Sequence, residues 1–157
     1  MQARSHTLFH FTKNLDTLKS ILQNGFWPRY CLEDFSWYNM NMNFIAYPLV
    51  SFCDIPLSRI DEHVAFYGEY GLGLTKEWAR VNRLNPVVYL SDSTVVRDSL
   101  LRLFRNHEKG NFYDESALDL NFLLSCIKPV EGDMWIGGKP VKKELPRKRM
   151  EICAFKS

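Results

Sequence analysis

Long apolar runs, metal-ligand spacings and phosphate-binding loops are all missing from this sequence. No apolar stretch approaches the roughly 20 residues that a membrane-spanning helix needs, so no membrane contact is predicted. The four cysteines, Cys31, Cys53, Cys126 and Cys153, contain no C-x-x-C pair, and the histidines lack zinc-ligand spacing. We therefore predict no metal site. Walker, G-x-G-x-x-G and H-E-x-x-H motifs are also absent from the sequence.

An excess of charge of one sign is also absent. Twenty Lys and Arg residues nearly balance 18 Asp and Glu residues, which leaves a net charge of +2. The overall charge therefore argues neither for nor against a nucleic-acid partner. Basic residues do crowd the end of the chain: Lys139, Lys142, Lys143, Arg147, Lys148 and Arg149. Such a segment is most often a solvated loop, and the alternative is contact with nucleic acid or an acidic partner.

The composition predicts one globular domain over residues 1–157. Of the 157 residues, 46% are hydrophobic and 14% are aromatic, enough for a substantial core. A core of this size does not need disulfides, and the sequence opens without a signal peptide, so we interpret the cysteines as free thiols in the cytoplasm. Strands and helices are mixed without strict βαβ alternation, which favours a compact α+β fold.

The first half begins with a strand and a helix whose limits are well marked. Residues 7–12 (TLFHFT) are rich in strand formers. Asn14 is suited to cap a following helix, and Gly25 is suited to end it. Residues 31–48 show neither the helical nor the strand period, which predicts a long loop with one helical turn. Further elements are expected over these ranges: strands at 49–55, 71–74 and 87–90, a helix at 59–67 capped by Ser58, a helix after a Thr75 cap, and a turn at Asn85-Pro86.

The second half looks more helical. One helix is expected between a cap at Ser91, Asp92 or Ser93 and Gly110, and a second begins at Asp114 or Ser116 and ends before Pro129. A hairpin is expected over residues 135–141, turning on the two glycines, and residues 150–155 have strand character.

His10 supports two interpretations. A lone histidine on an apolar strand is most often partly buried and bonded to a backbone carbonyl. Alternatively, His10 and Thr12 point to the same side of their strand, where both could hydrogen-bond a ribose or a carboxamide.

Other polar and aromatic residues also allow either a structural or a ligand-binding interpretation. Arg29 and Tyr30 are either surface residues or a phosphate clamp, because a guanidinium matches phosphate oxygens. Ser51 is either a locally bonded sheet serine or a site residue. Tyr67 and Tyr70 either fill the core or stack on a nucleobase or nicotinamide ring.

Several rare sequence words occur here in one order. They are LFHFT, L-x-x-I-L-x-x-G-F-W-P-R-Y-C-x-E-D, VSFCDIPLS, YGEYGLGLTKEWA and NPVVYL. In this order they resemble the AbiGi family, bacterial abortive-infection proteins tied to phage resistance and labelled as the antitoxin of a two-gene system. The resemblance runs from about Leu8 to Leu90. It implies a role in phage defence and a cognate toxin as partner.

A second resemblance concerns the opening alone. A strand ending H-x-T before L-x-x-I-L-x-x-G is similar to ADP-ribosyltransferases, including DNA-targeting toxins of the DarT type, and to RNA 2′-phosphotransferases. It implies a split sheet with flanking helices and NAD as substrate. By this resemblance His10 and Ser51 are catalytic candidates. The implied NAD-binding residues are His10, Thr12, Arg29, Tyr30, Tyr67 and Tyr70.

That fold also implies a late glutamate. Glu115, Glu131, Glu144 and Glu151 remain for this role, none in a recognisable motif, and Glu115 is the catalytic candidate. The chain ends near where the acidic motif is expected, which suggests a truncated or catalytically silent version. Two hypotheses follow: a phage-defence protein with an NAD-binding cleft that modifies nucleic acid or protein, or a non-catalytic antitoxin-like module that neutralises a toxin or regulates its operon.

Overall fold

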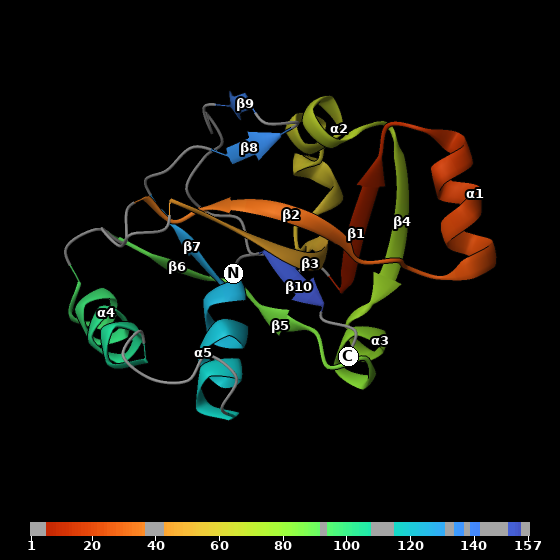
Figure 1. Ribbon diagram of the computed structural model, residues 1–157. Helices are drawn as coiled ribbons and strands as arrows, with labels where there is room; N and C mark the ends of the chain where they lie inside the picture. Colours follow the sequence, from red (N-terminus) through yellow and green to blue (C-terminus); the bar gives the residue numbers. More distant parts are fainter. Residues whose placement is uncertain are drawn as a thin grey trace. The chain divides into compact units, whose positions relative to one another are not determined.

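A computed structural model describes residues 6–36, 43–91, 94–107, 115–130, 134–136, 139–141 and 151–154 (Figure 1). It confirms the predicted α+β class, since helices accompany a mostly antiparallel set of strands. The largest sheet has the strand order β4-β1-β3-β10-β5, and β2 also pairs with β3. Strand β10, from near the end of the chain, lies between β3 and β5 (Figure 1).

Short strands and helices make up the described part of the chain. The strands are β1 Thr7–Thr12, β2 Arg29–Asp34, β3 Phe44–Cys53, β4 Tyr70–Thr75, β5 Asn85–Pro86, β6 Val88–Leu90, β7 Ile127–Pro129, β8 Met134–Ile136, β9 Lys139–Val141 and β10 Glu151–Ala154. The helices are α1 Leu15–Asn24, α2 Asp61–Tyr67, α3 Lys76–Val81, α4 Val95–His107 and α5 Glu115–Ser125, with a 3-10 turn, η2, at Leu57–Arg59.

The chain divides into two compact units, each assembled from separate segments. Unit 1 comprises residues 1–30, 48–86 and 145–157, and unit 2 comprises residues 31–47 and 87–144. The single domain expected over residues 1–157 stays a prediction.

Unit 1 begins with the predicted strand and helix, and both are confirmed. The Asn14 side chain accepts a hydrogen bond from the Asp16 backbone N–H at 2.8 Å and so caps α1. At the other end, Gly25 has a φ of 78°, and its N–H donates to the Ile21 carbonyl at 2.8 Å. The left-handed conformation favours glycine, which explains why α1 ends there.

The two sides of β1 carry different residues. Leu8 and His10 share one face with Phe52 of β3, and the core cluster on this face consists of Leu8, Val50, Phe52 and Ala79, with Phe26, Leu74, Trp78 and Leu84 packed against it. Phe9 and Phe11 lie on the other face, with their ring centroids 6.0 Å apart. They pair with Gly73 and Gly71 of β4. A Cβ on Gly71 would lie 2.8 Å from the Phe11 ring, so this glycine leaves room for the ring.

Three expectations about the loops and turns were wrong. The loop expected over 31–48 contains the end of β2 and the start of β3. Cross-strand pairing stabilises these strands although their residues show no strand period. Directly after β2, the Phe35 N–H donates to the Asn43 carbonyl at 2.8 Å. Asn85-Pro86 forms β5 and pairs with β10 rather than turning. The helix expected from residue 59 begins at Asp61, because Ser58 belongs to η2 and does not cap it.

Unit 2 contains the two predicted helices, α4 and α5, and a parallel pair of strands, β6 and β7. Thr94 rather than Ser91 caps α4, since its hydroxyl accepts from the Arg97 N–H at 3.3 Å. Asp92, Ser93, Gly110 and Asp114, which were expected near the helix ends, lie outside the described residues. The predicted hairpin is confirmed as β8 and β9, and its two glycines also lie outside the described residues.

Candidate functional site

His10 lies half-buried in unit 1 in an aromatic environment. Its Nδ1 lies 2.9 Å from the Ser51 carbonyl oxygen; because a carbonyl only accepts, Nδ1 carries the proton of this hydrogen bond. The ring centroid lies 5.2 Å from that of Phe26, edge to face, and 5.7 Å from that of Phe52. These contacts match the structural interpretation of this histidine. In the neutral ring they leave Nε2 as the acceptor for any further partner.

Thr12 lies on the same side of β1 as His10, but its hydroxyl hydrogen-bonds to the backbone of a nearby residue. The Asn14 N–H donates to Thr12 Oγ1 at 3.3 Å, and Oγ1 lies 3.5 Å from the Asn14 carbonyl oxygen. Thr12 therefore helps to form the turn that leads into α1.

Ser51 does not join His10 and Thr12 on one face. Phe52 shares the face of His10, and successive side chains of a strand point to opposite sides, so the Ser51 side chain points to the other face of β3. Only the Ser51 backbone carbonyl contacts the histidine. A ribose held jointly by the side chains of His10 and Ser51 does not fit this arrangement.

The remaining NAD-site candidates are dispersed over several elements. Tyr67 ends α2, where its ring packs against His63 and Phe66 at centroid distances of 5.5 and 4.7 Å. Tyr70 begins β4 and pairs with Thr12 across the sheet. The catalytic candidate Glu115 is an exposed residue in the first turn of α5, in unit 2. Of the other late glutamates, Glu151 lies in β10, and residues 131 and 144 lie outside the described residues.

The most exposed aromatic residues of unit 1 follow α1 directly. We call residues 27–30, Trp27-Pro28-Arg29-Tyr30, the aromatic–arginine segment. The exposed fractions of Trp27 and Tyr30 are 78% and 79%, and Arg29 is also exposed. Arg29 and Tyr30 were predicted as site residues, whereas Trp27 was not. Its signal in the sequence was a tryptophan two residues after a helix-ending glycine and directly before a proline, outside any apolar period.

Phe26 fixes the start of this segment. Its ring contacts three rings of unit 1, with centroid distances of 5.2 Å to His10, 5.0 Å to Phe52 and 5.8 Å to Trp78. Pro28 restricts the backbone on the other side of Trp27, because its ring fixes φ. Trp27 is therefore an exposed side chain on a restricted backbone. Because this backbone is already ordered, binding through Trp27 costs little further backbone entropy.

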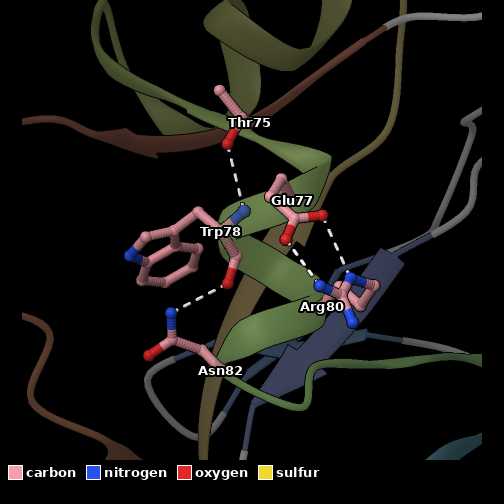
Figure 2. Close-up of polar contacts among 5 residues, drawn as sticks. All are labelled: Thr75, Glu77, Trp78, Arg80 and Asn82. Atoms are coloured by element: carbon pink, nitrogen blue, oxygen red, sulfur yellow. Dashed lines mark hydrogen bonds and ion pairs between the residues drawn. The ribbon is translucent and has the colours of Figure 1, made fainter.

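Helix α3 holds the Trp78 ring that supports Phe26 (Figure 2). The Thr75 hydroxyl accepts from the Trp78 N–H at 3.0 Å, and the Asn82 side chain donates to the Trp78 carbonyl at 2.8 Å. Arg80 donates to both carboxylate oxygens of Glu77, at 3.0 and 2.6 Å. This pairing lowers the pKa of Glu77 and raises that of Arg80. The cap at Thr75 confirms the sequence prediction.

Unit 2 has one well-shielded ion pair among its described residues. Lys128 of β7 lies 3.0 Å from the Glu33 carboxylate of β2, with side-chain exposed fractions of 13% and 18%. Cys31, two residues before Glu33, has its pKa raised by burial and by Glu33, with Lys128 acting in the opposite direction. A raised pKa keeps the thiol protonated and weakly nucleophilic, which indicates a structural cysteine.

Cys31, Cys53 and Cys126 are thiols rather than disulfides. Across the described ranges, no group of three or more His, Cys, Asp or Glu residues could hold a metal ion. None of the helices in this part of the chain is long and apolar enough to cross a membrane. Of the basic C-terminal segment, only the backbone of β9 is described; residues 142–149 lie outside the described ranges.

A comparison with known protein families shows to which family this chain belongs. Residues 24–146 match the family described as "Putative abortive phage resistance protein AbiGi, antitoxin". The chain belongs to the AbiGi family. The match extends beyond Leu90, where the rare sequence words end, and therefore includes α4 and α5. It also includes the aromatic–arginine segment, whereas His10 and Thr12 precede it.

One relative is the abortive phage resistance protein AbiGi of Lactococcus lactis subsp. cremoris. It is 27% identical over 142 residues, which cover 80% of this chain and 57% of the relative. The chain thus spans little more than half the length of that AbiGi protein. No solved structure matches this chain.

Proposed function

We propose that this AbiGi-family protein acts in phage defence as an antitoxin-type binding partner, and that the aromatic–arginine segment contacts a cognate toxin. The family description supports the antitoxin part of this proposal. The observation that supports the contact is the exposure of Trp27 and Tyr30, 78% and 79%, beside the anchored Phe26.

The chemistry of the segment suits a protein partner. Tryptophan, tyrosine and arginine are the residues most enriched at the energetic centres of protein interfaces. Trp27 and Tyr30 each offer a large apolar surface with a polar atom at its edge, and Arg29 offers a planar set of donors between them in sequence. Because α1, Phe26 and Pro28 restrict the backbone, binding costs less ordering than it would for a flexible loop.

Co-expression tests this proposal. The full chain is produced with the product of the neighbouring gene, and growth and complex formation are measured. The wild type should restore growth and co-purify with its partner. Trp27→Ala with Tyr30→Ala should raise the dissociation constant by about 30-fold or more, the effect of losing a hot spot of about 2 kcal/mol.

Val81→Ala provides the matched control, because Val81 of α3 is 66% exposed but lies outside the segment. It should bind as the wild type does. No complex with the wild type, or equal losses in the control and the double variant, would contradict the proposal. Binding of single-stranded RNA or DNA that depends on Trp27 and Tyr30, without any protein complex, would instead favour a nucleic-acid role.

NAD-dependent ADP-ribosyl transfer stays a separate prediction. Two features do not support it: the hydroxyl of Thr12 bonds to the local backbone, and the Ser51 side chain lies on the opposite face from His10. Incubation with labelled NAD and cell extract tests it directly. Transfer by the wild type that His10→Ala abolishes would support it, and its absence in both would end it without affecting the binding proposal.

A further inference from the structure

Helix α4 presents apolar residues on two sides. Leu101 and Phe104 are buried within unit 2, with exposed fractions of 7% and 4%. Val95, Val96 and Leu103 are instead exposed by 78%, 56% and 50%. Val96 and Leu103 are seven residues apart and therefore lie on the same side of the helix, away from the buried pair. This second side is the outer face of α4.

Helix α5 repeats this arrangement. Ala117, Leu120 and Leu124 are buried, with exposed fractions of 4%, 6% and 0%. Leu118 and Phe122, four residues apart, lie together on a different side and are exposed by 58% and 39%. Leu123, which is 51% exposed, lies about 100° around the helix from Phe122, with Glu115 and Asp119 between them. These three residues form the apolar part of the outer face of α5.

The charges of the two helices are opposite. In α4, the exposed Arg102 lies beside Val95 at the edge of the outer face, whereas Arg105 and the mostly buried Arg97 lie on other sides of the helix. In α5, Glu115 and Asp119 give a net charge of −2, and this helix contains no basic residue. Both acids of α5 are exposed, four residues apart, so they border the apolar residues of its outer face.

We infer that the outer faces of α4 and α5 bind a second copy of this chain. The two faces are apolar and carry opposite charges, so α4 of one copy complements α5 of the other. A two-fold axis forms this contact twice, which closes the assembly as a dimer of two helical hairpins. The apolar residues provide the affinity, and the opposite charges fix which helix faces which. This inference is independent of the proposed antitoxin role.

The apolar contribution is tested by the oligomeric state of the full chain. Sedimentation velocity over a concentration series should show a reversible dimer for the wild type. Leu103→Ser with Phe122→Ser should raise the dimer dissociation constant at least 30-fold. Leu57→Ser, which changes a residue of η2 exposed by 66%, is the matched control and should leave the constant unchanged. Circular dichroism of all variants verifies that they fold.

Charge exchange supplies a test that loss of folding cannot mimic. Arg102→Glu and Asp119→Lys each place like charges across the contact, so each variant alone should be monomeric. Mixed together, the two variants form opposite charges at both copies of the contact and should associate as a heterodimer. A wild type that remains monomeric at all concentrations overturns the inference. So do single variants that dimerise as well as the wild type, or a mixture that does not associate.

Discussion

The two compact units differ in how their apolar side chains pack and in which of them are exposed. In unit 1, aromatic rings meet around the sheet: His10, Phe26, Phe52 and Trp78 make mutual ring contacts with centroids 5.0 to 5.8 Å apart. In unit 2, aliphatic residues line the inner sides of two helices and recur on their outer sides, as with buried Leu120 and exposed Leu118. In unit 1, the most exposed aromatic residues, Trp27 and Tyr30, follow an anchored ring, whereas in unit 2 exposed apolar residues recur along two helices. The first pattern suits a local contact and the second suits an extended one.

The largest effects should come from the two buried cores. Phe52→Ala in unit 1 should lower the free energy of unfolding by about 4 kcal/mol, and Leu124→Ala in unit 2 by about 3 kcal/mol, because each leaves a cavity at a side chain that is 0% exposed. Urea unfolding measures both. Leu118→Ala on the outer face of α5 should change the value by no more than about 0.5 kcal/mol. Equal losses for Leu118→Ala and Leu124→Ala would show that the two sides of α5 are not distinct.

A smaller effect should come from the ion pair of unit 2. Lys128→Met removes the partner of a carboxylate that is only 18% exposed and should cost about 2 kcal/mol. Adding Glu33→Gln should recover most of this loss, because no unpaired charge then remains. In unit 1, Lys19→Met breaks a pair whose side chains are 60% and 85% exposed and should cost less than about 0.5 kcal/mol. Thermal unfolding of the three variants compares the two pairs, and similar losses for Lys128→Met and Lys19→Met would remove the contrast between them.

A loss smaller than that of the unit 2 ion pair should come from removing the cap that supports Trp78. Thr75→Ala removes the acceptor of the Trp78 N–H and should cost about 1 kcal/mol, whereas Thr75→Ser keeps the hydroxyl and should cost little. Near-ultraviolet circular dichroism should also weaken in Thr75→Ala, because the Trp78 ring becomes less ordered against Phe26. An unchanged spectrum together with unchanged stability would show that the cap does not position this ring.

Most predictions that rest on local signals were accurate, although Ser58 does not cap α2. The caps at Asn14 and Thr75 and the helix end at Gly25 depend on bonds between residues close in sequence. The strand at 7–12 was predicted from its strand-forming residues, although its pairing partners in β3 and β4 are distant in sequence. Local periodicity failed where long-range pairing decides the structure. β2 and the beginning of β3 were predicted as a loop because their apolar and polar residues alternate irregularly. β5 was predicted as a turn, although it pairs with β10.

The sequence by itself determined the AbiGi membership and the α+β class. The role of Arg29 and Tyr30 as site residues stays a prediction. Tertiary structure decided which residues near them stay in the solvent. Phe26 and Trp27 are adjacent aromatic residues of similar hydrophobicity, yet one packs against His10 and the other is 78% exposed. Only the positions of β1, β3 and α3, which come from distant parts of the chain, create the space that one ring fills. The burial of a side chain depends on those distant neighbours, and no local pattern contains them.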